Sequence, residues 1–132
     1  MLAHIAAVKA LLAPLGYQVH YVDVPEAPTL PYVLLWGTGG APGPERSLCG
    51  PVGITDRLGV TCVAGTPDGV LIVQGAVRGV LDDSHPAVPD RFVTLSLWDA
   101  RAVQVDRDVT LPGTNRHPAY GVDLYALTSV PV

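Results

Sequence analysis

The chain has little charge, and above all little positive charge. Charged residues make up 15% of its 132 residues, below the quarter that is usual in globular proteins. Lys9 is the only lysine, the arginines are scattered singly, and the formal net charge is −4. A protein that binds nucleic acid directly presents a basic patch or stripe. We therefore expect no specific nucleic-acid binding, although an acidic protein is compatible with a channel through which DNA slides.

Cysteine is also scarce. Cys49 and Cys62 form no CxxC pair and have no histidine close by, so they do not match a zinc site. Cys62 lies in a predicted strand and Cys49 in a predicted loop, and we expect two free thiols, with Cys62 as a small core residue. His4, His20 and His117 are isolated, and no pair has metal-ligand spacing. The sequence predicts no metal site.

Long apolar runs are absent too. No segment approaches the apolar length that crosses a bilayer, and no basic region followed by an apolar run marks a signal peptide. We expect a soluble protein without a membrane partner, made in a reducing compartment. The length fits one domain, residues 1–132, and 48% of the residues are apolar, enough for a core. So many apolar residues with so little charge suggest that an assembly covers part of the surface; the alternative is a compact monomer with large buried helices.

Catalytic motifs are missing as well. The serines lack a GxSxG-like setting. His85 beside Asp82 and Asp83 is the nearest approach to an acid–base cluster, but such residues at a helix end more often cap backbone groups or face solvent. Residues 37–40 (GTGG) resemble a phosphate-binding loop, yet they lack the following Lys-Ser/Thr and do not lead into a helix. The sequence therefore predicts no catalytic site.

The clearest local pattern is a strand followed by a helix. An apolar run, residues 58–63, predicts a buried strand. Thr66 is a good N-cap, Pro67 suits the first helical position, and Asp68 places negative charge at the positive end of the helix dipole. The helix then shows one apolar face, formed by Val70, Val73, Val77 and Val80. This unit predicts a helix packed on a sheet.

The same rules predict the other elements. A helix is expected at residues 2–15, and further strands at 17–24, 32–36, 92–97, 103–105 and 120–127. The strand at 32–36 is apolar throughout, so we expect cover on both of its faces. The strands at 92–97 and 103–105 are expected to form a hairpin, with a turn at 98–101. The sequence thus predicts an α+β fold: a mostly antiparallel twisted sheet of about six strands with two helices packed on one face.

One long segment, residues 37–53, is dominated by turn formers. Nine of its seventeen residues are glycine or proline, a density that no regular element tolerates. A loop of this length in a small domain is usually functional or disordered. It is either a mobile linker or an arm that orders on a neighbouring subunit. Trp98, in the predicted turn, is either an anchor for an interface or a cover for the end of its own core.

Four short segments carry a resemblance to a known family. They are residues 31–35 (PYVLL), 56–69 (DRLGVTCVAGTPDG), 105–109 (VDRDV) and 121–125 (GVDLY). In type and order they resemble the tail terminator proteins of long-tailed bacteriophages, of the kind found in phages of high-GC bacteria. The resemblance covers most of the chain by order of elements, and the strand–Thr-Pro–helix segment is its most specific part. The connection 82–91 is longer than the family's usual turn.

The resemblance implies a structural protein of the virion rather than an enzyme. In that family, subunits form a hexameric ring on the head-proximal end of the tail tube. The ring stops tube polymerisation and offers a docking face to the head-completion proteins of the neck, and DNA crosses its lumen without specific binding. The resemblance further implies an α+β fold, no cofactor, and a place in the virion tail after synthesis in the host cytoplasm.

A closed ring sets a physical requirement, because one patch must meet a different patch on the neighbour. A long arm and an exposed sheet edge that receives it would meet this requirement, and six copies make weak contacts add up. Our candidates for contacts are Glu45, Arg46, Leu48, Arg57, Trp98, Arg101, Arg107 and Arg116. One alternative is another connector ring of the neck, a head-closure or tail-completion protein. Another is a small ligand-binding or enzymatic domain on a ferredoxin-like sheet, which needs a pocket with converging polar groups.

Overall fold

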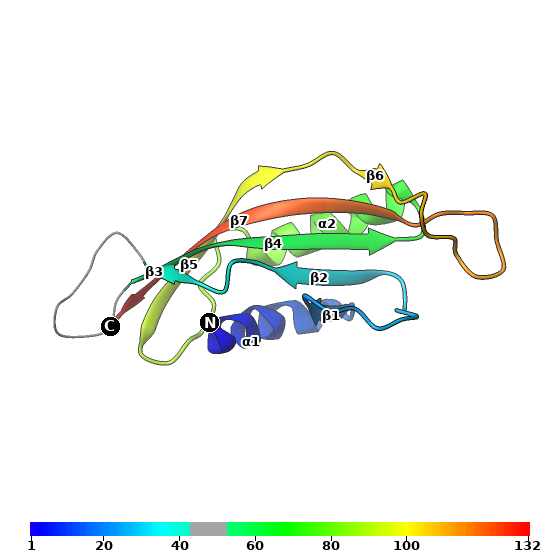
Figure 1. The fold of residues 1–132 in the computed structure, drawn as a ribbon. Helices are drawn as coiled ribbons and strands as arrows, with labels where there is room; N and C mark the ends of the chain where they lie inside the picture. The colour runs from blue at the N-terminus through cyan, green and yellow to red at the C-terminus, as the bar shows by residue number, and fades with distance from the viewer. Residues whose placement is uncertain (43–52) are drawn as a thin grey trace.

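The computed structural model describes residues 1–42 and 53–132, which form two α-helices and a seven-stranded sheet (Figure 1). The first helix, α1 (Leu2–Leu12), continues into a 3-10 turn, η1 (Ala13–Leu15), and the second is α2 (Pro67–Leu81). The strands are β1 (Gln18–Tyr21), β2 (Tyr32–Trp36), β3 (Ala41–Pro42), β4 (Ile54–Ala64), β5 (Arg91–Ala100), β6 (Gln104–Val105) and β7 (Ala119–Pro131).

The sheet is built around two long central strands. The strand order is β1-β2-β4-β7-β5, with the short β3 paired to β4 and the short β6 paired to β7. Only β1 and β2 run parallel among the described pairs, and β4 pairs with β7 along its whole length, from Ile54 opposite Ser129 to Ala64 opposite Ala119. The predicted α+β fold with a mostly antiparallel sheet is confirmed.

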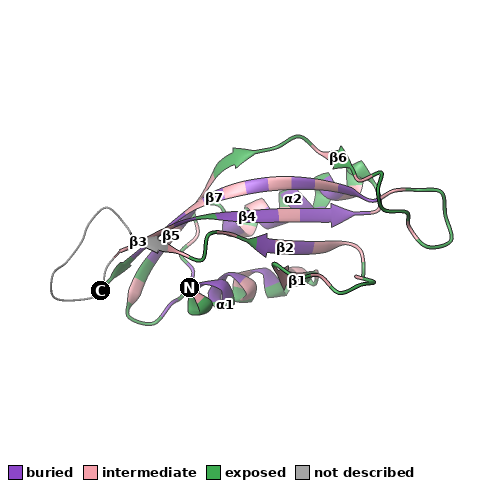
Figure 2. Cartoon of the chain, in the orientation of Figure 1, coloured by how far each residue is buried: buried purple, intermediate pink, exposed green. Residues whose placement is uncertain are grey.

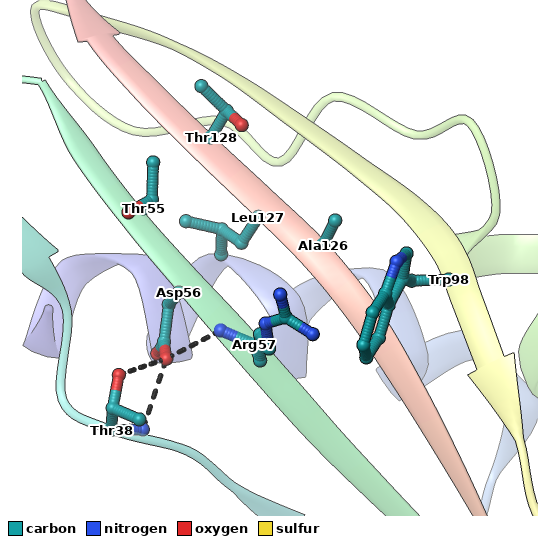
Figure 3. Close-up of a pocket in the computed structure, with 8 residues that line it drawn as sticks. All are labelled: Thr38, Thr55, Asp56, Arg57, Trp98, Ala126, Leu127 and Thr128. Atoms are coloured by element: carbon teal, nitrogen blue, oxygen red, sulfur yellow. Dashed lines mark hydrogen bonds between the residues drawn. The ribbon is translucent and has the colours of Figure 1, made fainter. Parts of the chain in front are cut away.

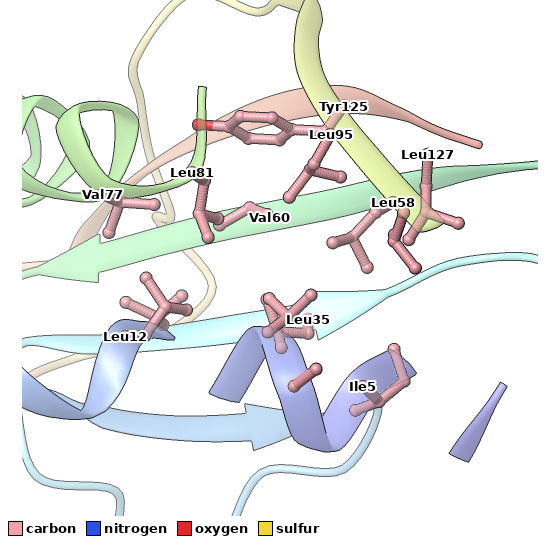
Figure 4. Packing of buried hydrophobic residues seen from close by; sticks show 14 of the residues in the cluster. Ile5, Leu12, Leu35, Leu58, Val60, Val77, Leu81, Leu95, Tyr125 and Leu127 are labelled. Atoms are coloured by element: carbon pink, nitrogen blue, oxygen red, sulfur yellow. The ribbon is translucent and has the colours of Figure 1, made fainter. Parts of the chain in front are cut away.

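Both described helices cover the same face of the sheet. Side chains of α1 and α2, such as Leu12 and Val77, pack with Leu35, Leu58 and Tyr125 of the strands in one core (Figure 4). Burial alternates along β7, as a strand with one covered face requires (Figure 2). The sheet therefore has a helix-covered face and an opposite face that no helix of the described residues covers.

Helix α2 follows its sequence signals closely. The Thr66 hydroxyl accepts a hydrogen bond of 3.0 Å from the backbone N–H of Gly69, and Pro67 begins the helix. Of the predicted apolar face, Val70, Val73 and Val77 are buried, and Val80 is half-buried. Buried Cys62 is a free thiol, as predicted; Cys49 lies outside the described residues.

Three predictions about strands were wrong. Residues 98–101 are no turn, because β5 continues to Ala100 through a β-bulge at Trp98. Residues 103–105 make no hairpin with 92–97: β6 instead pairs with β7, beyond the end of β5 and along the same edge. Strand β2 is covered on one face only, since Val33 and Leu35 are buried while Trp36 is exposed. Strand β7 is long enough to pair with both β5 and β6, so the chain forms neither the turn nor the hairpin. Strand β2 keeps one accessible face because no helix of the described residues packs on that side of the sheet.

The connection after α2 seals the outer edge of β5. Ser84 exchanges two backbone hydrogen bonds with Leu95, of 3.1 and 3.0 Å. The carboxylate of Asp82 accepts a hydrogen bond from the backbone N–H of Leu97, and Nδ1 of His85 lies 3.1 Å from the carbonyl oxygen of Val93. The residues that resembled an acid–base cluster thus satisfy backbone groups of an edge strand, which blocks pairing with other chains there.

Candidate assembly interface

The face of the sheet opposite the helices is rich in apolar and aromatic side chains. We call it the open face; its residues are Leu34 and Trp36 of β2, Arg57, Thr61 and Val63 of β4, Trp98 of β5, and Tyr120, Val122, Leu124, Ala126 and Thr128 of β7. Along β7 these positions alternate with the buried ones, as the two-residue period of a strand dictates, while Val63 of β4 is itself buried. Arg57 is the one charged side chain among them, and Asp99 of β5 adds a negative charge directly opposite Leu124.

Trp36 lies flat on the neighbouring strand. Its ring occupies the space above Gly59, where a Cβ would stand 2.1 Å from the ring. Its indole Nε1 donates a hydrogen bond of 3.0 Å to the hydroxyl of Thr61. The indole keeps an exposure of 37%. The missing side chain at Gly59 therefore fixes a large aromatic surface against the sheet while leaving it accessible.

Arg57 and Trp98 come together at one end of the open face. The guanidinium carbon of Arg57 lies 3.7 Å from the centre of the Trp98 ring, a cation–π contact. Both side chains line a cavity of about 380 Å³, together with Thr38, Thr55 and Thr128 (Figure 3). Trp98 remains 55% exposed. Much of the ring therefore faces solvent instead of covering the core of its own chain.

The carboxylate of Asp56 supports this end of the face from below. One of its oxygens accepts hydrogen bonds from the backbone N–H and the hydroxyl of Thr38 and from the backbone N–H of Arg57 (Figure 3). The carboxylate is buried and forms no ion pair with Arg57 among the described residues. Asp56 thereby links Thr38, just beyond the end of β2, to strand β4. The guanidinium of Arg57 has no ion-pair partner among the described residues.

Two further cavities continue along β7. One, of about 330 Å³, is lined by Trp36, Arg101 and Leu124, among others. The next, of about 440 Å³, lies between the segments 26–30 and 106–112, with Tyr120 on its floor. Residues of β7 line all three cavities, so the cavities lie in a row along the open face, and we call this row the trough.

The predicted contact residues fall into three groups. Arg57 and Trp98 meet, and Arg101 lines the next cavity, where it forms an exposed ion pair of 3.6 Å with Asp99. Arg107 and Arg116 are exposed in the segment between β6 and β7. Glu45, Arg46 and Leu48 lie outside the described residues.

Other exposed apolar side chains escaped the sequence reasoning. Leu71 and Ile72 of α2 are 58% and 68% exposed. The signal was present in the run Val70 to Val73, because four consecutive apolar residues on a helix are more than one buried stripe needs. Trp36 was visible as one of two tryptophans, but nothing in the sequence placed it over Gly59.

The helix-covered face holds an ion pair instead of a reactive centre. The guanidinium of Arg78 donates two hydrogen bonds, each of 2.7 Å, to the fully buried carboxylate of Asp123. Burial raises the pKa of the nearby Cys62 thiol to about 12, and burial likewise raises the pKa of Tyr125. Both groups therefore stay protonated at neutral pH, which makes Cys62 a poor nucleophile.

Buried His4 links α1 to the end of β7. Its Nε2 lies 2.8 Å from the hydroxyl of Ser129, which also accepts a hydrogen bond of 2.6 Å from Arg91. Burial, followed by the positive N-terminus and Arg91, lowers the pKa of His4. No group of three or more metal-binding side chains that could hold an ion occurs among residues 1–42 and 53–132. In the same ranges, no helix has the length and apolar character needed to cross a membrane.

Comparison with known proteins supports the fold. No protein-family model matches the sequence, and no curated protein is similar to it at a significant level. Among solved structures, the chain is similar to a chain of a structure described as "Virion of native gene transfer agent (GTA) particle". The two share 17% sequence identity with a TM-score of 0.60, over 95% of this chain and 93% of that chain. At this identity the likeness establishes a shared fold across almost the full length of both chains.

Proposed function

We propose that this chain is a structural protein of a phage-like virion, and specifically a tail terminator. In this role, copies form a hexameric ring on the head-proximal end of the tail tube, stop its growth, and present a docking face to the neck proteins. The observation that carries the proposal is the fold shared, end to end, with a chain of a virion particle. The four sequence segments that resemble tail terminators support the finer assignment.

The surface supports a role in assembly rather than in catalysis. The open face leaves two tryptophans and several apolar side chains accessible, with Arg57 and Arg101 as the cations that line its cavities. Contiguous apolar surface of this kind marks protein–protein contact sites in soluble proteins. Three cavities lie in a row along it, and none of the described residues that line them is a histidine, cysteine or serine. A ring subunit needs such a surface, and DNA passing a net acidic protein is not retained.

The length of tails tests the role. Particles made without this protein are expected to carry tails of uncontrolled length and no attached heads, and the added protein is expected to restore both. Tails of normal length that merely lack heads would assign the chain to a head-closure or tail-completion ring instead. A monomer that gains thermal stability from a small metabolite would favour the ligand-binding alternative and contradict the proposal.

A further inference from the structure

Helix α2 presents a second apolar surface, on the side away from the sheet. Asp68, Leu71, Ile72, Gly75 and Gly79 are all exposed and recur at helical spacing, so they share one stripe. Beyond Asp68 the stripe carries no charge. Any Cβ at Gly75 or Gly79 would meet open space, so another backbone is able to approach the helix closely there. The stripe is thus two large apolar side chains and two glycines, with one carboxylate at its N-terminal end.

The open face has the matching dimensions and the opposite charge. From Thr128 to Tyr120 the trough along β7 extends about 27 Å, at 3.4 Å per residue. The stripe from Asp68 to Gly79 needs about 16 Å, at 1.5 Å per residue. Arg57 lies at one end of the trough, and Glu26 and Asp106 line the other end. The N-terminal end of the stripe, with Asp68, therefore matches the Arg57 end of the trough in charge, whereas Glu26 and Asp106 would repel it at the other end.

We propose that α2 of one copy docks in the trough of a second copy of this chain, with Asp68 paired to Arg57 and Leu71 and Ile72 packed against Trp98 and Leu124. The inference rests on the proposed ring and names the contact between its subunits. The two surfaces lie on opposite sides of each molecule, so every copy offers both and the contact is heterologous. Such a contact produces a closed ring when the rotation that relates neighbouring copies adds up to a full turn.

The charges select α2 over α1 as the occupant. Helix α1 also exposes small apolar residues, but it carries Lys9 and the positive N-terminus and no acidic side chain. Its approach would bring like charges to Arg57. Neither Arg57 nor Asp68 has an ion-pair partner in the described part of its own chain. Each is therefore free to pair with the other across two copies, where a complementary charge fixes the register of the contact.

A charge exchange tests the pair. Arg57→Glu and Asp68→Arg are each expected to weaken self-association by about tenfold or more, because attraction becomes repulsion. The variant with both changes is expected to regain association. Lys9→Glu and Asp23→Arg reverse charges of the same signs at positions that line none of the three cavities, and they are expected to leave association unchanged. Sedimentation of the full chain, alone and with purified tail tubes, measures association, and circular dichroism shows that each variant is folded.

The outcomes separate this inference from the proposed function. Rings that form normally with either single reversal would overturn the α2 docking and leave the terminator role standing. The same holds for single reversals that abolish rings without recovery in the double variant. A wild-type chain that forms no ring even on tail tubes would contradict the proposed function itself, and the docking with it.

Site-directed cross-linking tests the direction of the helix. In a Cys49→Ser background, Leu71→Cys on one copy is expected to cross-link to Ala126→Cys on another through a short bismaleimide, and only when the two variants are mixed. Gly79→Cys lies about 12 Å farther along α2 and is expected to react poorly with Ala126→Cys. Buried Cys62 stays unreactive. Rings without the Leu71–Ala126 cross-link would show that something else occupies the trough.

Discussion

At the scale of single residues, a few side-chain contacts determine which aromatic and charged groups of this protein are accessible. Gly59 has no side chain, and Trp36 takes its place above the strand. Arg57 stacks on Trp98 and pairs with no acid of the described residues. By contrast, Arg78 and Asp123 neutralise each other under α2. The described charges under α2 are therefore paired, whereas on the open face Arg57 has no ion-pair partner among the described residues.

Replacing Gly59 with alanine tests the position of Trp36. The new Cβ displaces the indole, which loses its hydrogen bond to Thr61, at a cost of about 1 kcal/mol in the free energy of unfolding. Tryptophan fluorescence is expected to shift to the red, and urea unfolding measures the cost. Gly75→Ala is the matched control, because open space surrounds Gly75; an exposed helical glycine replaced by alanine gains up to about 1 kcal/mol. Equal effects of the two changes would contradict the placement of Trp36.

Removing Arg78 tests the buried ion pair. Arg78→Ala leaves the buried carboxylate of Asp123 without its partner and is expected to cost about 3–5 kcal/mol. Arg101→Ala breaks the exposed pair with Asp99 and is expected to cost at most about 1 kcal/mol. Chemical denaturation of both variants measures the difference. Similar small losses would show that Asp123 is reached by water.

At the scale of elements, the predictions that succeeded depend on neighbours in the sequence. Helix α2 was predictable because its N-cap, first-turn proline and apolar spacing lie within the helix itself. The pairing of strand β6 could not be predicted, because its partner, β7, lies farther along the chain. The bulge at Trp98 could not be predicted either, because the sequence there resembles a turn. The Arg57–Trp98 pair joins two strands and needed the sheet order to be known.

The N-cap of α2 gives a test at this scale. Thr66→Ala removes the hydroxyl that binds the N–H of Gly69 and is expected to cost about 1 kcal/mol in stability. Thr66→Ser keeps a hydroxyl in the same place and is expected to retain most of the stability. Thermal unfolding compares the two. A serine variant as unstable as the alanine variant would show that the methyl group of Thr66, rather than the cap, matters.

The docking of α1 is expected to depend on pH through His4. Burial lowers its pKa in the folded protein below the unfolded value of 6.5, so the unfolded chain binds the proton more readily. Stability from this group is complete above pH 6.5 and is lost as the pH falls toward the folded pKa. His4→Gln is expected to show a smaller loss of stability between pH 7.5 and pH 5. Parallel pH profiles for the two proteins would contradict a buried neutral His4.

At the scale of the whole molecule, both described helices pack on one face of the sheet, and no helix of the described residues covers the other face. The low charge of the sequence predicted that an assembly covers part of the surface. It did not predict which part, because the sequence pattern of one chain carries no information on the partner that covers it. In the proposed assembly this surface is the open face, where Trp36 and Trp98 are exposed. The sealed edge of β5 directs association away from strand pairing there and toward this face.

The most direct test of this account is a reconstruction of the head-proximal end of the tail by cryo-electron microscopy. The account predicts a closed ring of this chain capping the tube, with Trp98 and Leu124 of every copy covered by the neighbouring copy. A single copy per particle, or a ring whose sheets keep these two side chains exposed, would contradict it.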